Sequence, residues 1–491
     1  MSILDFIILL PLAAALAIGA GLPARRTALA AAGLNLLLGL IALARFGNHD
    51  PSSGPAFAAS RTVSRNPEIA WAVGLDGMSL VLLLLTVLVT FAALWQAGTP
   101  KDNVRLFYIS LLLISAGSLG AFLTTDLFFL YAFHELALIP TFLLIGIFGK
   151  GDRRAAAWKI TIYLAAGSLV LLAGLLLLVL ALVQDGALTF DLAALAERAA
   201  AQPIGDSSQS LIYLLLLIGF GTLVALFPLH SWAAPAYAAA PTPAVMLHAG
   251  VLKKFGLYGL LRLSPLLPAG AERWLTLLLV LLLGNILFVG LVTLTQKRLD
   301  SMLAHSSVMH MGYIFLGIAA FQADHTLGAA GAVLLMFAHG LSIALLFALA
   351  GRLEEKLGSL DMTKLGGLAK ITPRFAFLFG LAAFASIGLP GFANFTGEIL
   401  VFLGGFQSLE PGAPLGGLQI ATILAVWGVV ISAVYMLRAY RAIFLGELTE
   451  SNVTASLTDL TLSQKLPAGL LVAGLLVTGI YPWFLQRFLE F

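Results

Sequence analysis

Runs of apolar residues, each long enough to cross a bilayer as a helix, recur along the whole 491-residue chain. One helical crossing needs about 17–25 predominantly apolar residues, and about 14 stretches reach that length. They lie near 3–21, 27–45, 78–97, 104–123, 125–149, 158–183, 211–230, 244–266, 274–295, 302–320, 327–350, 373–405, 417–437 and 466–485. The pattern predicts an all-α, polytopic membrane protein of about 14 transmembrane helices with no separate soluble domain.

The segments between these stretches are short and polar. The longest lie around 46–75, 184–210, 352–372 and 439–465. The segment 352–372 predicts an amphipathic stretch on the membrane surface. The first apolar stretch has no basic residues before it and carries Asp5, which favours a first spanning helix over a cleaved signal peptide.

Composition supports the membrane assignment and excludes several functions. The chain is 60% hydrophobic and only 10% charged, whereas soluble domains are about 25% charged. No basic cluster with interleaved aromatic residues accompanies the net charge of +3, so nucleic-acid binding is not expected. Without cysteine the chain has no disulfide, no thiolate-bound iron–sulfur cluster and no cysteine-based zinc site. Any redox chemistry is therefore expected in other subunits.

The distribution of lysine and arginine predicts the orientation of the chain. Loops after odd-numbered helices carry about 18 of these residues and the opposite loops about 7, and the richer side faces the cytoplasm. Both termini are therefore expected on the non-cytoplasmic side of the cell inner membrane.

Two long stretches are interrupted by proline in similar surroundings, at Pro228 in LFPLH and at Pro390 in GLPGF. Broken helices in corresponding halves indicate inverted repeats that bind an ion near the membrane midplane, and an ordinary proline kink is the alternative for either break alone. The expected organisation is three helices over 1–103, a first five-helix repeat over 104–266, a second over 267–437, and a loop with a last helix over 438–491.

Lys253 and Lys254 stand in the middle of an otherwise apolar run. A lysine at mid-helix opposes insertion by about 2.5–3.5 kcal/mol, so an ion pathway is the default hypothesis. Successive helical residues point about 100° apart, which means that the two lysines cannot face the same partner.

Further titratable groups lie within predicted helices. They include Glu135 in YAFHELALIP, His305 and His310 in MLAHSSVMHMGYIF, His339 in FAHGLSIALL and Glu398 in FTGEILVF. Histidine is the side chain best suited to relay protons near neutral pH, and carboxylates and lysines can take and release them. A lone histidine bonded to a backbone carbonyl, and a glutamate that caps backbone amides at a helix break, are the structural alternatives.

At these residues the chain resembles a known family. The stretches VGLDGMSL, YAFHELALIPTFLLIG, FPLHSWAAPAYAAAPTPAVMLHAGVLKKFGLYGLLR, SSVMHMGYIFLGI, FAHGLSIALLFALAGR and FASIGLPGFANFTGEILVFLGGF closely resemble the NuoM-type M subunits (chain 4) of bacterial NADH-quinone oxidoreductase, respiratory complex I. The resemblance covers essentially the whole chain. It implies a non-redox, antiporter-like subunit of the membrane arm that translocates protons, driven by quinone reduction elsewhere.

The resemblance also implies partners and roles. NADH, FMN, iron–sulfur clusters and quinone are expected in partner subunits, with L-type and N-type subunits flanking this one in the lipid bilayer. The glutamate of the fifth helix matches Glu135, the lysine of the eighth helix matches Lys254, and the relay histidines match His310 and His339. The acid of the broken twelfth helix matches Glu398, where sibling subunits and sodium/proton antiporters generally carry lysine.

Two departures from the family pattern lead to further expectations. The family's lysine five residues before the proline of the broken seventh helix is replaced by Leu223, and Lys253 is an additional lysine. The hypothesis is that Lys253 supplies the missing cation beside Glu135. In TQKRLDSML, Arg298 and Asp300 reverse the family's order of acid and base, so that a charge pair is still expected.

Two other functions compete with the pump subunit. A subunit of a related cation/proton antiporter or ion-coupled transporter is the nearer alternative, and Glu398 is an argument against it. A membrane enzyme acting on lipids or sugars is disfavoured because the chain lacks acidic metal-binding clusters at its loops.

Overall fold

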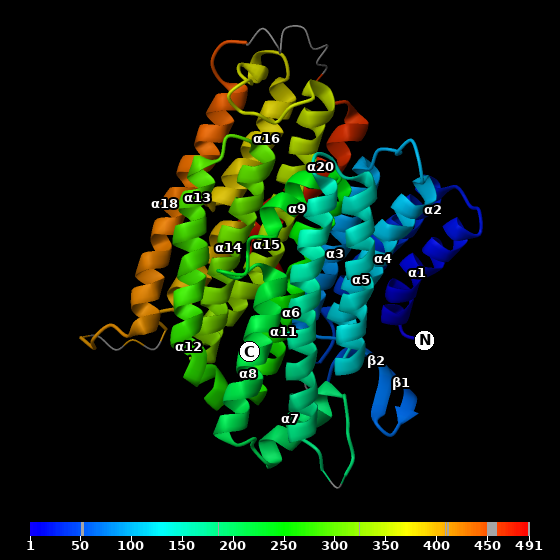
Figure 1. The fold of residues 1–491 in the computed structure, drawn as a ribbon, viewed down its shortest axis with the longest axis vertical. Coiled ribbons are helices and arrows are strands. Elements are labelled where there is room, and N and C mark those ends of the chain that lie inside the picture. Colours follow the sequence, from blue (N-terminus) through cyan, green and yellow to red (C-terminus); the bar gives the residue numbers. More distant parts are fainter. Residues whose placement is uncertain are drawn as a thin grey trace.

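Long apolar helices dominate the computed structural model, which describes residues 1–50, 54–184, 186–323, 325–407, 409, 412–448 and 459–489 (Figure 1). Within these ranges, twelve segments are long and apolar enough to cross a membrane. Most of them are single helices: α2 (Ala24–Phe46), α3 (Gly77–Gln96), α4 (Val104–Leu123), α5 (Leu127–Phe148), α6 (Arg153–Ala181), α8 (Asp206–Val224), α14 (Leu299–Gln322), α15 (Thr326–Leu357), α18 (Gly417–Phe444) and α20 (Leu462–Ile480).

The two remaining long crossings contain π-helical turns. The first consists of α10 (Thr242–Leu247), the π turn η2 (His248–Leu252), α11 (Lys254–Leu263) and the short 3₁₀ turn η3 (Ser264–Leu266). The second consists of α12 (Pro268–Leu283), the π turn η4 (Gly284–Val289) and α13 (Gly290–Thr295). π turns inside α-helices occur frequently at functional sites. The paired lysines directly follow η2.

Shorter apolar helices complete the set of crossings. They are α1 (Ile3–Gly19) and the pair α16 (Pro373–Ile387) and α17 (Ala393–Gly404), which are two parts of one broken crossing. With them, the described residues contain the 14 crossings that the apolar pattern predicts.

The structure confirms a helix break at each of the two prolines. After α8 the chain runs without regular helix past Pro228 to α9 (Ala233–Ala239). Asn285 satisfies the backbone that this break exposes, because its Oδ1 accepts from the Phe227 N–H at 2.6 Å and its Nδ2 donates to the Ala225 carbonyl at 3.1 Å. The second break separates α16 from α17. The division of the chain into two five-helix units and their inverted relation both stay predictions.

A β-hairpin corrects the expectation of an all-α chain. β1 (Ala56–Arg65) pairs antiparallel with β2 (Glu68–Leu75), within a segment that was expected to be a polar loop. The two strands form a two-stranded sheet, and β2 makes isolated bridges to Thr124 and Thr189. Most of β1 is exposed, so no strong apolar alternation marks it in the sequence. The remaining short elements are α7 (Leu192–Ala201), η5 (Leu368–Lys370) and α21 (Trp483–Gln486).

Both ends of the chain contact the region of the hairpin. The Ser2 hydroxyl donates to the Phe57 carbonyl at 2.6 Å. Near the other end, the Phe488 ring packs edge-on against Phe46, with ring centroids 5.4 Å apart. The two termini therefore lie on one side of the helix bundle, as an even number of crossings requires.

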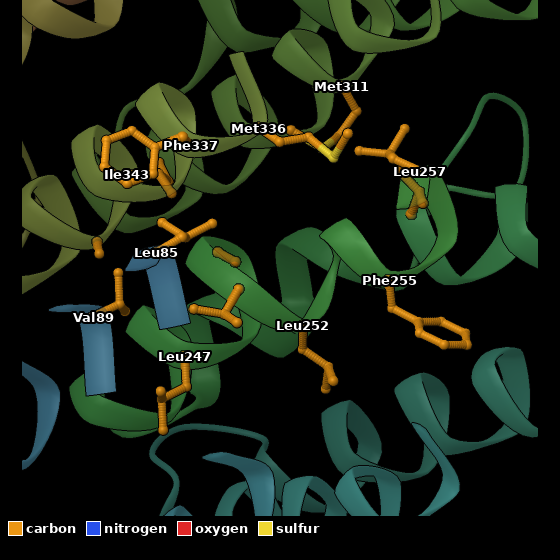
Figure 2. Packing of buried hydrophobic residues seen from close by; sticks show 14 of the residues in the cluster. Leu85, Val89, Leu247, Leu252, Phe255, Leu257, Met311, Met336, Phe337 and Ile343 are labelled. Carbon is orange, nitrogen blue, oxygen red and sulfur yellow. The ribbon is translucent and has the colours of Figure 1, made fainter. Parts of the chain in front are cut away.

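Apolar packing joins α3, α10 and α15 in the interior of the bundle. Leu85 and Val89 of α3, Leu247 of α10 and Ile343 of α15 pack in one cluster (Figure 2). The crossing from Thr242 to Leu266 and the helix α15 are both buried along their most apolar stretches. Lys253 and Lys254, on the first of these segments, are thereby removed from lipid and from bulk water.

Candidate functional site

Lys254 and His339 form the centre of the candidate site. The Lys254 ammonium donates to the Ala249 carbonyl at 2.7 Å and lies 2.9 Å from Nδ1 of His339. Both residues are fully buried, with exposed fractions of 0% and 2%. The second ring nitrogen of His339, Nε2, has no hydrogen-bond partner among the described residues. The lysine and the histidine can therefore share one proton directly.

Two glycines allow the backbones of η2 and α15 to approach each other at this point. A Cβ on Gly250 would lie 3.0 Å from the Gly340 carbonyl, and a Cβ on Gly340 would lie 2.6 Å from the Gly250 carbonyl. Small residues permit such close helix packing in membranes. Since Gly340 directly follows His339, this approach brings the imidazole within reach of the lysine on the facing helix.

His310 continues the chain of polar groups. Its ring centroid lies 5.6 Å from that of His339. Nδ1 lies 2.7 Å from the Ser306 carbonyl and Nε2 lies 2.9 Å from the Ser386 carbonyl. A neutral imidazole has one N–H and can satisfy only one of these carbonyls, whereas the doubly protonated ring satisfies both. The surroundings of His310 therefore accommodate an additional proton.

Glu398 lies beside the break between α16 and α17. Its side chain is buried against Gly388, whose φ of +82° is a left-handed conformation that favours glycine. A Cβ on Gly388 would overlap the carboxylate Oε2 and would lie 2.9 Å from the carboxylate carbon. The break therefore provides the room that the buried carboxylate occupies.

Two tyrosines that the sequence reasoning missed lie near His310. Tyr313 packs edge-on against His310 with ring centroids 5.8 Å apart. The Tyr435 hydroxyl lies 2.7 Å from that of Ser306. The spacing of three residues between His310 and Tyr313 indicates a shared helix face, but nothing in the sequence indicates Tyr435 of α18.

Glu135 lies away from this centre, at the periphery of α5. Its side chain is 38% exposed and lies 3.6 Å from Nδ1 of His134. The Ser168 hydroxyl of α6 donates a hydrogen bond to its Oε1, and the Tyr131 hydroxyl lies 3.1 Å from Ser168. Within the described ranges, no lysine or arginine forms an ion pair with it.

The hypothesis that Lys253 lies beside Glu135 is wrong. The Lys253 ammonium instead lies 3.4 Å from the Ser307 hydroxyl of α14 and 5.7 Å from the centre of the Tyr237 ring of α9. The direction towards α5 is taken by Phe255, whose ring stacks on His134 at 4.1 Å. The two lysines do diverge as the helical geometry predicts, but neither points to the fifth helix.

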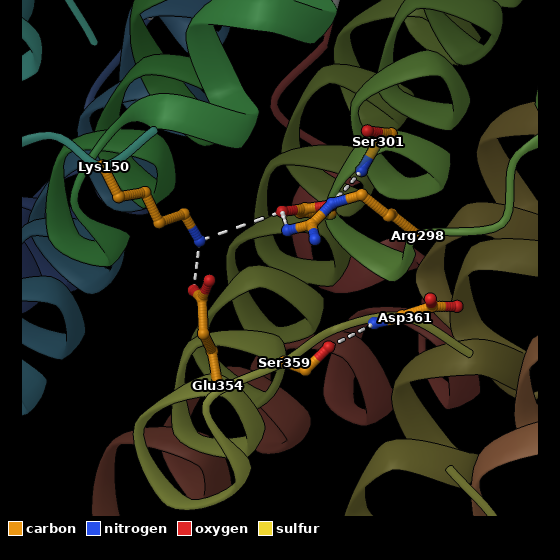
Figure 3. A network of polar contacts seen from close by, with 7 residues as sticks. Lys150, Arg298, Ser301, Glu354, Ser359 and Asp361 are labelled. Atoms are coloured by element: carbon orange, nitrogen blue, oxygen red, sulfur yellow. Dashed lines mark hydrogen bonds and ion pairs between the residues drawn. The ribbon is translucent and has the colours of Figure 1, made fainter. Parts of the chain in front are cut away.

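The expected charge pair at Arg298 and Asp300 is present and belongs to a larger network (Figure 3). Arg298 donates to both carboxylate oxygens of Asp300, at 3.1 Å and 2.7 Å. Lys150, after α5, lies 3.8 Å from Asp300 and pairs with Glu354 at the end of α15. The hydrogen bonds to Asp300 raise the pKa of the Arg298 guanidinium above its usual value. The network joins the end of α5 to the start of α14 and the end of α15, at the side that carries most lysines and arginines.

No metal centre is indicated in the parts of the chain that the structure describes, where no group of three or more histidine, aspartate or glutamate side chains could hold an ion.

Comparisons with known proteins agree on one family. Residues 124–412 match the family model described as NADH:quinone oxidoreductase/Mrp antiporter, TM. The chain is 37% identical over 404 residues to an NAD(P)H-quinone oxidoreductase chain 4 of Microcystis aeruginosa, covering 82% of this chain and 71% of that one. It is also 37% identical over 487 residues to chain 4 of Synechococcus sp. (strain JA-3-3Ab), covering 98% of this chain and 90% of that one.

A solved structure with the same fold is a chain of the respiratory complex I from Thermus thermophilus with bound NADH. Its TM-score is 0.87 at 30% sequence identity, with 99% of this chain and 98% of that chain covered. The similarity therefore extends over the whole fold.

Proposed function

Because this chain belongs to the family of antiporter-like, proton-translocating membrane subunits of NAD(P)H-quinone oxidoreductase, complex I, we propose that Lys254, His339, His310 and Glu398 form its proton relay. The observation that carries this assignment is the direct contact of 2.9 Å between Lys254 and Nδ1 of His339. Titratable groups that face each other inside a membrane bundle typically mark proton pathways.

The relay works by successive transfers between neighbouring groups. Lys254 gives a proton to Nδ1 of His339, and the ring can then release the proton on Nε2, which regenerates a neutral imidazole. His310 accepts it, because its two carbonyl partners satisfy the doubly protonated ring. Tyr313 and Tyr435 carry the path on to the carboxylate of Glu398, whose protonation completes one passage.

Glu135 has a different position and, in this proposal, a different role. A carboxylate that is 38% exposed on a membrane helix is costly against lipid. We therefore assign this face of α5 and α6 to a neighbouring membrane-arm subunit, whose charge changes reach Glu135. The ring of His134, stacked on Phe255 directly after Lys254, links this face to the start of the relay.

The driving reaction and the orientation follow from the same family membership. We assign NADH, FMN, iron–sulfur clusters and quinone to partner subunits, and place L-type and N-type subunits beside this one. The side that carries the network of Lys150 and Asp300 is taken as cytoplasmic, so that both termini are non-cytoplasmic in the bacterial inner membrane.

The proposal is tested in the intact complex, reconstituted in vesicles, by measuring the pH gradient and quinone reduction together. Lys254→Ala and Glu135→Gln should each abolish proton translocation through this subunit while the complex still assembles. Lys101→Ala, at an exposed position, is the control and should behave like the wild type. Undiminished translocation with Glu135→Gln or Lys254→Ala would contradict the assigned roles.

A further inference from the structure

We propose that Lys253 is a second proton-accepting residue, which takes protons from a cavity between α9 and α14 and passes them to His310. This inference rests on the proposed proton relay and adds an access route to it. The inference is based on two neighbouring features. A polar cavity lies on one side of the contact between α9 and α14, and the fully buried ammonium of Lys253 lies on the other.

The cavity has a volume of about 360 Å³ and is lined by one side of each helix. His230 precedes α9, Ala234 and Ala238 lie one turn apart on it, and Ser301 and His305 lie one turn apart on α14. The volume holds several waters, and two histidines with a serine supply the polar partners that water needs.

The position of the cavity connects it to one membrane surface. Ser301 belongs to the first turn of α14 and directly follows Asp300 of the charge network. The last residue of α9, Ala239, accepts a backbone hydrogen bond from Lys150 at 2.8 Å. The cavity therefore opens near the side that is rich in lysine and arginine.

Lys253 lies directly across the contact between the two helices. Tyr237, under its ammonium, is the neighbour of the cavity residue Ala238, and Ser307 is the neighbour of the cavity residue Val308. The Ser307 hydroxyl and carbonyl, at 3.4 Å and 3.5 Å, are its hydrogen-bond acceptors among the described residues. An ammonium has three donors, so water from the cavity is the natural further acceptor.

Lys253 also contacts the helix that carries His310, because its ammonium lies 3.4 Å from the Ser307 hydroxyl of α14. Ser307 and His310 are three residues apart and share one face of α14. The other titratable groups around Lys253 include His248 of η2, bonded to the Tyr237 hydroxyl at 3.0 Å, His339 of α15, and Lys254 on its own crossing.

The proton step balances without any further reactant. A hydrated proton in the cavity moves along hydrogen-bonded water, and a new N–H bond forms on the neutral Lys253 amine as an O–H bond of the last water breaks. The ammonium later transfers that proton to a ring nitrogen of neutral His310, which restores the amine. Lys254 supplies His339, so the two lysines would feed different histidines.

Water access to the cavity is tested by cysteine labelling, because the chain has no native cysteine. Ala238→Cys lines the cavity, and Ala166→Cys is the control on the exposed outer face of α6. Assembled complex in sealed vesicles is treated with a charged, membrane-impermeant thiol reagent from the lysine-rich side, and this subunit is analysed by mass spectrometry. Labelling of Ala238→Cys without labelling of Ala166→Cys supports the proposal, and an unlabelled Ala238→Cys overturns it.

The role of Lys253 is tested by proton translocation per quinone reduced. Lys253→Leu should lower this ratio while assembly on native gels persists. Lys253→Arg keeps a cation of similar reach but stays protonated, and it should show the same loss. A purely structural role for the charge predicts instead that Lys253→Arg is normal, which would overturn the proposal.

The double variant Lys253→Leu with Leu223→Lys tests whether Lys253 merely replaces the lysine that the family carries on α8, at the position of Leu223. The structure predicts that a lysine at position 223 does not restore translocation, because Lys253 does not serve Glu135. Restoration would overturn the inference. Normal translocation in Lys253→Leu, with loss in Lys254→Ala and Glu135→Gln, would refute this inference alone and leave the proposed function standing.

Discussion

Substitution of Gly388 by alanine probes the space that the helix break gives to Glu398. Gly388 has φ +82° and ψ 41°, a left-handed conformation, and its α-carbon faces the buried carboxylate. An added methyl group would overlap Oε2 and lie 2.9 Å and 3.2 Å from Cδ and Oε1. The carboxylate would have to move, because the three atoms nearest to the added methyl group all belong to the Glu398 side chain.

The expected cost has two parts that a second glycine separates. A left-handed conformation costs a residue with a Cβ about 1–2 kcal/mol. Gly391, with φ +95° in the same break, has no atom within 4 Å of the position that a methyl group would take. Its substitution by alanine therefore carries the backbone cost alone, without a steric clash. Gly391→Ala should therefore lower stability by about 1–2 kcal/mol and leave proton translocation intact. Gly388→Ala should add a shift of Glu398 and lose translocation.

Both variants are compared in the purified complex. Thermal unfolding of the membrane arm reports the shared backbone cost, and the pH gradient formed per quinone reduced reports the position of the carboxylate. If Gly388→Ala pumps as well as Gly391→Ala at a temperature where both complexes are assembled, the close packing of Gly388 against Glu398 has no functional meaning and the reasoning fails.

Three further substitutions test the surroundings of the relay. Asp300→Asn weakens the charged hydrogen bonds from Arg298 and should lower stability by about 1.5–3 kcal/mol, measured as a lower Tm. Asn285→Leu leaves the Phe227 N–H at the first break unpaired and should cost about 1–3 kcal/mol for each buried group so exposed; an unchanged Tm would contradict this. Tyr435→Phe removes the hydroxyl that lies 2.7 Å from that of Ser306, beside His310, and should slow translocation without reducing assembly, as measured by the initial rate of acidification.

The crossings and the two breaks were predictable because lipid imposes simple rules on sequence. A helix that spans the bilayer must be apolar over about 20 residues, and a break must be tolerated by neighbouring groups. The β1–β2 hairpin escapes these rules because it lies outside the crossings. Asn285, which repairs the backbone at the first break, was not predicted either, since a single amide in an apolar run does not indicate what it contacts.

Only those residues of the site that place a titratable group within an apolar run could be predicted from the sequence. Lys254, His310 and His339 stand out because each is expensive in lipid, and the structure brings them together. Their contacts depend on packing that no local pattern encodes, such as the approach of Gly250 to Gly340. For Lys253, helical geometry correctly predicts the divergence from its neighbour, but the predicted partner is wrong because the helix presents Phe255 towards α5.

The separation of Glu135 from both lysines changes how coupling must work in this chain. With Leu223 on α8 and Lys253 on the far side of its helix, the described residues offer Glu135 hydroxyls and one histidine as partners, and no lysine. In the proposed mechanism, a charge change at Glu135 arrives from a neighbouring subunit and reaches Lys254 through His134 and the Phe255 ring stacked on it. It follows that substitutions of His134 should uncouple translocation from quinone reduction even with the internal relay intact, whereas a relay driven from within by its lysines would tolerate them.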